Sequence, residues 1–344
     1  PHPEMITAIF LLMNHSLFCI NLVKRKCYII NKETRLYSAC RYFPMIIKET
    51  ELMKNGLKYL VVMEPNLPQS SRQPLPQQIA LFKAAELALK TNASIEAFAC
   101  THLTDKEINQ HSSRQEAKRT AMETLMHWNT NEIAQVSKKG ISVSTHIEWN
   151  SEYTKAVCYR AKAIRSNIIV ATKADKGNDC DNNDEQTLLR YAPCPVLLTH
   201  SANHSRSGIV LAAVDTQTMD GAHQALNNAI LAAAFNLAED TDSTMHLVCA
   251  LDEKKAVATH LGFEYLEDIS SEQAKIAEQF NIPLDQVHVQ LGNPQIIIKE
   301  RAETLNTDTL VIGTKARKGI AGIFIGNTAE KVLSKVVCDV LVVN

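Results

Sequence analysis

The chain has 344 residues, of which 45% are hydrophobic and 21% are charged, a composition that predicts a folded protein and excludes extended disorder. This length favours two domains of about 150 residues, each with its own core. The 36 basic and 37 acidic residues nearly cancel to a net charge of -1, which excludes attraction to nucleic acid or to an anionic membrane through the overall charge.

Residues 1–52 contain an apolar stretch, 5–26, that fits neither a signal peptide nor a membrane span. The stretch lacks a cationic leader and a small-residue cleavage site, and polar residues between Asn14 and Asn21 interrupt it. The composition changes after Met53, so we expect the fold to begin there. Residues 1–52 are then an N-terminal extension outside the fold, or an artefact of where the start was assigned. A peripheral membrane anchor is the alternative.

Three matched blocks in the same order indicate an internal duplication. Glu64, after the first apolar run, matches Asp215, and the closing segments 194–200 and 338–344 match each other. The third block pairs "IVATKADKG" (169–177) with "LVIGTKARKG" (310–319). We therefore expect a first domain at 53–204 and a second at 205–344.

Each copy alternates short apolar runs with helical patterns, which predicts parallel strands covered by helices on both faces. Helical spacing marks a long helix around Ala117 to Trp128 in the first copy and another around Leu226 to Leu237 in the second. The expected strands are 57–63, 94–100, 141–148, 167–172 and 195–199, then 208–214, 244–251, 286–291, 308–313 and 339–343. The predicted fold class is α/β, with two tandem, doubly wound, five-stranded parallel-sheet domains.

Doubly wound sheets bind ligands at the carboxyl ends of their strands, where the strand order reverses. In the second copy these ends carry Asp215, the turn Gly292-Asn293-Pro294 and the glycine-rich stretch 311–328. The sequence contains neither a P-loop nor a G-x-G-x-x-G fingerprint. A flavodoxin-like phosphate loop after the first strand is only weakly indicated, because the first copy lacks it. A receiver-like site fails, because no Asp follows the third strand at the phosphoacceptor position and no Lys follows the fifth.

The stretch "VIGTKARKGIAGIFIGNT" and the closing segment up to residue 343 resemble the universal stress protein family. Nucleotide-binding members carry G-x2-G-x9-G-[ST] between the fourth strand and the last helix. The resemblance covers about residues 53–344, is closest to tandem members, and implies a fold of the adenine nucleotide alpha hydrolase-like kind. It is highly specific for the second copy, whereas the first lacks the glycines.

The resemblance implies a nucleotide- or phosphate-binding site in the second domain. Gly313 matches the first motif glycine, and Gly326 matches the third, which opens the last helix. Asp215 matches the acid that contacts base or ribose in family members, although an acid at a strand end is also common in solvated loops. The implied site consists of Asp215, Gly292, Pro294, Gly313, Thr314, Ala316, Gly326, Asn327 and Thr328.

Two positions depart from the motif and weaken the expected grip on phosphate. Ala316 replaces the second glycine, and Asn327 stands where Ser or Thr is expected. Asn327 with Glu330 also fits a helix cap that needs no ligand. Lys315, Arg317 and Lys318 could add anion affinity, but solvated surface cations are at least as common.

The first copy has lost more of the motif, so we expect no nucleotide there. Ala171 is taken to replace its first glycine, and the acidic run 178–185 would repel phosphate. This run resembles a calcium loop only in part, because Arg190 occupies the last ligand position, and we predict no metal site. Histidines such as His246 and His288 fit surface or strand-face positions, and we identify no catalytic residue.

We expect a cytoplasmic stress-response protein that binds or regulates, with at most weak ATP hydrolysis. Its nine cysteines include no CxxC pair, which favours reduced thiols. The expected ligand is ATP, another adenine nucleotide or a different small phosphorylated molecule. The alternative is a nucleotide-independent adaptor that acts through protein partners. The closing strands favour an intramolecular pseudo-dimer, and a further homodimer is left open, with no nucleic acid or stable membrane association.

Overall fold

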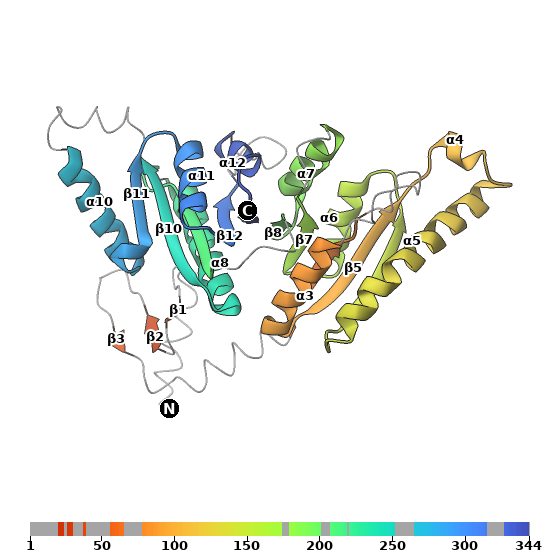
Figure 1. Cartoon of the computed structure of the whole chain (residues 1–344), viewed down its shortest axis with the longest axis horizontal. Helices are drawn as coiled ribbons and strands as arrows, with labels where there is room; N and C mark the ends of the chain where they lie inside the picture. Colours follow the sequence, from red (N-terminus) through yellow and green to blue (C-terminus); the bar gives the residue numbers. More distant parts are fainter. Residues whose placement is uncertain are drawn as a thin grey trace. The chain divides into compact units, whose positions relative to one another are not determined.

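The structure is a computed structural model of the whole chain (Figure 1). The residues that it describes are 20–23, 26–29, 37–38, 56–64, 78–173, 179–200, 207–218, 220–251, 265–314 and 327–343. The chain divides into two compact units, Pro1–Gly56 and Leu57–Asn344. The first unit contains a three-stranded antiparallel sheet of β1 (Ile20–Val23), β2 (Lys26–Ile29) and β3 (Tyr37–Ser38).

The second unit is built on one sheet of ten strands in the order β11-β10-β9-β12-β13-β8-β7-β4-β5-β6. Its strands are β4 (Lys58–Val62), β5 (Ser94–Thr101), β6 (Val143–Trp149), β7 (Ile168–Thr172), β8 (Val196–Thr199), β9 (Ile209–Val214), β10 (Thr244–Leu251), β11 (Val287–Leu291), β12 (Thr309–Gly313) and β13 (Asp339–Val343). All ten predicted strands are confirmed, with their ends shifted by no more than two residues. Apolar runs explain this success in the central strands, which are buried on both faces, whereas the edge strand β6 has no buried residue.

The strands β4–β8 form a first half of the sheet and β9–β13 a second half with the same order, third-second-first-fourth-fifth. Pairing is parallel inside each half. The halves meet at a seam where β13 runs antiparallel to β8, with Leu341 opposite Leu197. The α/β class with a mostly parallel sheet is therefore confirmed.

Helices cover both faces of the sheet (Figure 1). One face carries α3 (Ile79–Thr91), α5 (Arg114–Ser137), α8 (Gly221–Thr241) and α10 (Tyr265–Phe280). The other carries α6 (Tyr153–Ala163), α7 (Asp179–Tyr191), α11 (Pro294–Thr304) and α12 (Asn327–Leu333). The short α4 (Asp105–Ile108) and the 3-10 turn η1 (Leu284–Gln286) lie in connections. Both predicted long helices are confirmed, as α5 and α8.

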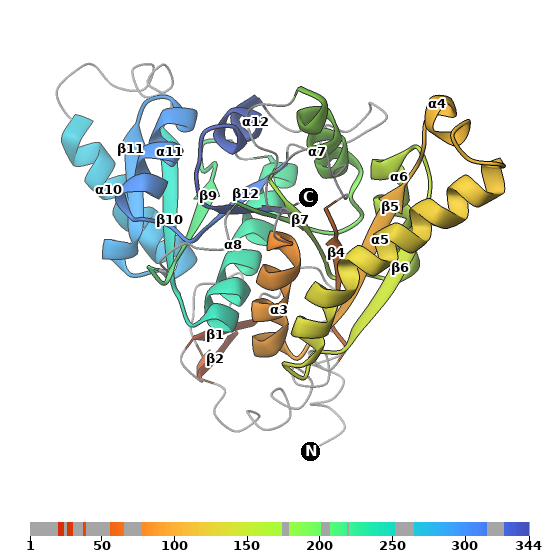
Figure 2. The same ribbon diagram turned by 45° about the vertical axis from the view of Figure 1, so that its right-hand side comes forward.

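The core on the α3 and α8 face continues across the seam. Leu197 of β8 and Leu341 of β13 belong to the same buried cluster as Ala84 of α3 and Ala234 of α8. Figure 2 shows α3 and α8 side by side, and the two helices are in contact. Lys83 of α3 adds an ion pair to Asp339 of β13, with Nζ and Oδ2 3.1 Å apart. The two halves thus share apolar and charged contacts.

The strand register corrects one match between the copies. Thr172 of β7 lies opposite Thr199, and Gly313 of β12 lies opposite Val343. Thr199 and Val343 hold the same place in the matched closing segments, so Thr172 is the counterpart of Gly313. The prediction that Ala171 replaces the first glycine is wrong by one residue. A shift of one residue along a strand moves a side chain to the other face of the sheet. Ala171 is buried on the α6 and α7 face, whereas Gly313 faces Leu226 of α8 on the other face.

Candidate functional site

The strand order reverses between β9 and β12, and this pair of strands forms the switch point of the second half. The two strands pair in parallel with Val311 opposite Ala212, so their carboxyl ends lie at the same edge. Asp215 follows β9, and Gly313 ends β12. The structure therefore brings these two predicted site residues to neighbouring strand ends, the place where ligands bind in doubly wound sheets.

The carboxylate of Asp215 is exposed and organises its own loop. Its Oδ1 accepts a hydrogen bond from the backbone N–H of Gln217 at 3.0 Å, and its Oδ2 accepts one from the hydroxyl of Thr218 at 2.7 Å. This is the local turn that Asp commonly forms with the backbone two residues on. A carboxylate has more acceptor sites than these two bonds occupy, so Asp215 is able to accept further donors from a ligand.

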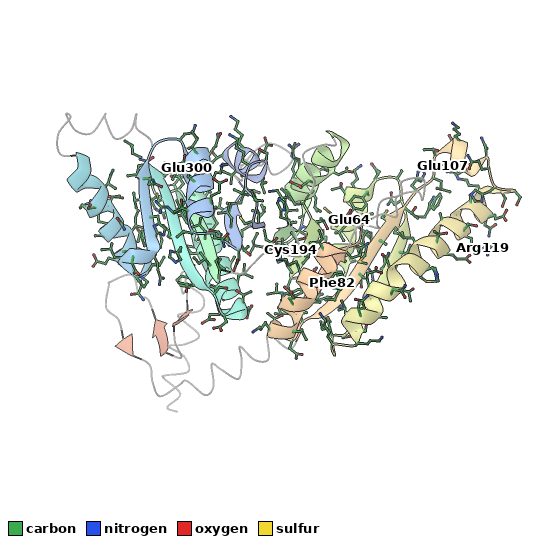
Figure 3. The ribbon with its side chains drawn as sticks, viewed as in Figure 1. Glu64, Phe82, Glu107, Arg119, Cys194 and Glu300 are labelled. Carbon is green, nitrogen blue, oxygen red and sulfur yellow. The ribbon has the colours of Figure 1, made fainter. Side chains whose placement is uncertain are left out.

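A buried amide of α8 clamps the backbone of Asp215. Asn227 accepts from the Asp215 N–H at 3.2 Å and donates to the Asp215 carbonyl at 2.7 Å. The first half repeats this clamp with Gln78, which accepts from the N–H of Glu64 at 2.9 Å and donates to its carbonyl at 3.4 Å. Glu64, labelled in Figure 3, is the residue that the sequence matched with Asp215. The clamps were missed because the two amides hold different places relative to their acids.

Gly313 contacts a side chain of α8 at very short range. A Cβ atom built on Gly313 would lie 2.7 Å from Cγ of Leu226, closer than real Cβ contacts occur. Gly313 also has no positive φ, so a special backbone conformation does not explain it. Its glycine is instead required by the close approach of Leu226. Helical spacing predicts that Leu226 lies on a helix, but its contact with Gly313 depends on how α8 packs against β12.

Thr314 is turned into the protein. It is fully buried, its N–H donates to the carbonyl of Val343 at 2.9 Å, and its hydroxyl donates to the same carbonyl at 3.4 Å. These bonds tie the end of β12 to the end of β13. In this arrangement Thr314 supports the strand end and offers no hydroxyl to a ligand.

The turn after β11 starts α11. Gly292 has a φ of 133°, which side-chain-bearing residues rarely adopt. Asn293 caps α11 by accepting from the N–H of Gln295 at 2.9 Å, and Pro294 occupies the first turn. Two strand positions separate β11 from β9, so Gly292 and Pro294 stand to one side of the switch point.

The structure describes only some of the remaining predicted site residues. Ala316 and Gly326 lie outside the described residues, as do the cations Lys315, Arg317 and Lys318. Asn327 begins α12, but its side chain is not among those described, whereas Thr328 is half-buried in the first turn. Within the described parts of the chain, no group of three or more His, Cys, Asp or Glu residues could hold a metal ion.

Two histidines outside the predicted site form a pair on β10 and β11. His246 Nδ1 and His288 Nε2 lie 3.0 Å apart, and the rings are nearly parallel. Burial lowers the pKa of His288 to about 4, and the neighbouring cation of Arg301 and His246 act in the same direction. Burial also lowers the pKa of His246. Asp285 opposes both shifts. The pair is therefore held neutral near pH 7.

Acid is expected to destabilise the protein through this pair. The His288 pKa falls from 6.5 when unfolded to about 4 when folded, so the unfolded chain binds more protons between these values. The free energy of unfolding should decrease by on the order of 2 kcal/mol as the pH falls through this window. Urea unfolding at several pH values measures it. His288→Gln should flatten the curve, whereas His127→Gln on the exposed face of α5 should not. An unchanged slope in His288→Gln contradicts the assignment.

The chain is similar in sequence to universal stress proteins. The sequence model of the universal stress protein family matches residues 208–344. Universal stress protein E of Salmonella typhi is 26% identical over 304 residues, covering 83% of this chain and 93% of the relative. Universal stress protein A homolog 2 of Coxiella burnetii is 30% identical over 118 residues, covering 32% of this chain and 80% of the relative.

The fold comparison extends over both halves of the sheet. The crystal structure of a functionally unknown protein from Pseudomonas aeruginosa PAO1 matches with a TM-score of 0.63 and 27% identity, covering 85% of this chain and 94% of the other. Among the described residues, no helix is long and apolar enough to cross a membrane. The resemblance read from the closing segment is thus confirmed by the relatives. The chain belongs to the universal stress protein family.

Proposed function

We propose that the second half binds an adenine nucleotide, such as ATP, or another small phosphorylated ligand, and that the protein acts in a stress response by binding or regulation. The observation that carries this proposal is the position of Asp215 and Gly313 at the carboxyl ends of neighbouring parallel strands. Asp215 is exposed there and retains acceptor capacity for ribose or base. The phosphate groups are proposed to lie against the residues of the partial family motif. These residues, assigned from the sequence alone, are Ala316, Gly326, Asn327 and Thr328.

The first half is proposed to bind no nucleotide. Thr172 occupies the place of Gly313, so a side chain stands where the motif needs a bare backbone. Together with the acidic run 178–185, this disfavours a bound phosphate. The repeated strand order and the paired β8 and β13 support a tandem arrangement in which two domains form an intramolecular pseudo-dimer.

A nucleotide-independent adaptor is the second candidate, and a specific contact favours it. Leu226 covers Gly313, and the hydroxyl of Thr314 is engaged by Val343, so part of the ligand space is filled. Such a protein would act through protein partners. Either function is proposed for the cytoplasm, since the five cysteines whose side chains the structure describes are all free, as a reducing compartment would keep them.

A melting experiment with ATP separates the two candidates. One millimolar MgATP is expected to raise Tm by a few degrees if Kd is about 10 μM. The ligand is then at about 100 times its Kd and stabilises the native state by about 2.7 kcal/mol. Asp215→Ala should reduce the rise, because it removes the carboxylate that would accept hydrogen bonds from the ligand. The Asn227 side chain bonds only the backbone of residue 215, so this clamp survives the change. Glu64→Ala, the matched change in the first half, should leave the rise intact. No rise in the unmodified protein contradicts nucleotide binding and favours the adaptor.

A further inference from the structure

Leu226 and Asn227 are consecutive residues of α8 that reach the two sides of the switch point. Asn227 holds the backbone of Asp215, after β9, by two hydrogen bonds. Leu226 packs on Gly313, at the end of β12, at the distance that only a glycine tolerates. The same turn of α8 therefore holds Asp215 in place on one side of the proposed ligand site and fills the space over Gly313 on the other side.

The backbone of α8 is held in place on both sides of Leu226. Asp220 caps the start of α8 by accepting from the N–H groups of Ala222 and His223 at 3.0 and 2.9 Å. Asn227 is buried and clamped, and Ile230 and Leu231 anchor the next turn in the core. The helix therefore does not move without breaking these contacts. The side chain of Leu226 is only half-buried, so rotation about its own bonds is the available movement.

We propose that Leu226 is a gate residue that competes with the ligand for the space over Gly313. This inference rests on the proposed nucleotide function. The gate is closed when the isobutyl group lies against Gly313, and a ligand that needs the bare glycine backbone binds only after the side chain has rotated away. A larger side chain at this position closes the site, and a smaller one opens it.

The gate lowers the apparent affinity by the fraction of molecules in which it is open. Apparent Kd equals the intrinsic Kd divided by that fraction, so an open fraction of about one tenth weakens binding about tenfold. Leu226→Ala removes the competing group and is expected to tighten ATP binding by about this factor. Leu226→Phe places a bulkier group over Gly313 and is expected to weaken binding to a similar or greater extent.

The test is an isothermal titration of the full-length chain with MgATP, for the unmodified protein, Leu226→Ala and Leu226→Phe. Leu237→Ala is the control, because Leu237 lies near the other end of α8 and packs into the core away from the switch point. The control should lose stability but keep its affinity for ATP. Circular dichroism establishes that each variant is folded before titration.

The outcomes separate the gate from the function on which it rests. Tighter binding by Leu226→Ala with weaker binding by Leu226→Phe supports the gate, and so does binding that is detectable only in Leu226→Ala. Equal affinity in the unmodified protein and Leu226→Ala overturns the gate and leaves nucleotide binding standing. If neither protein binds ATP at millimolar concentration, both the nucleotide function and the gate are overturned.

Discussion

Replacement of Lys83 by methionine is expected to lower the free energy of unfolding by about 3 kcal/mol or more. Lys83 Nζ lies 3.1 Å from Asp339 Oδ2, and the side chains are only 15% and 7% exposed. Asp339 also accepts a hydrogen bond from the N–H of His200 through its other oxygen. Without Lys83 the carboxylate stays buried with its compensating cation removed. The loss should appear as a lower urea midpoint for the ten-stranded unit.

A second change distinguishes the charge effect from simple loss of packing. Asp339→Asn keeps an oxygen for His200 but removes the charge, so Lys83→Met combined with Asp339→Asn should recover much of the lost stability. Lys275→Met is the matched control, because Lys275 pairs with Glu272 while 69% exposed, and should cost less than about 1 kcal/mol. Equal urea midpoints for Lys83→Met and Lys275→Met would show that the ion pair between Lys83 and Asp339 adds no more to the free energy of unfolding than an exposed pair does.

Replacement of Gly313 by alanine is expected to destabilise the ligand-free protein by about 1–3 kcal/mol. The added methyl group would lie 2.7 Å from Cγ of Leu226, an atom near the base of its side chain that cannot swing away without a change of rotamer. The clash lies in ordinary packing between α8 and β12, so it is present without any ligand. Thermal unfolding without nucleotide measures the loss.

A double-mutant cycle tests the cause of this destabilisation. Leu226→Ala makes room for the new methyl group, so the two changes together should cost at least about 1 kcal/mol less than the sum of the single changes. Gly221→Ala is the control, because nothing lies within 4 Å of a Cβ at that position. The explanation fails if Gly313→Ala has the same Tm as the unmodified protein. It also fails if the losses in the free energy of unfolding from Gly313→Ala and Leu226→Ala simply add in the double variant.

The candidate site was predictable only in part. Asp215 was predicted because it directly follows an apolar run, whereas Gly313 was predicted from the motif of the family that the stretch resembles. Parallel strands bring both positions to one edge of the sheet. Thr314, next along the chain, was assigned to the same site, yet its hydroxyl serves Val343. Adjacency in sequence says which strand end a residue belongs to, but the bend of the chain after the strand decides where its side chain points.

The class of fold, the positions of the ten strands of the large sheet and the family follow from the amino-acid sequence, because apolar patterning and local motifs are properties of neighbouring residues. The folded chain was needed to show that Thr172 stands in for Gly313. It was also needed to show that Asn227 and Gln78 clamp the strand ends and that Leu226 covers Gly313. It also decided that Lys83 meets Asp339 across the seam. These contacts join residues far apart in the chain, and strand register and helix placement set them through the packing of the whole core.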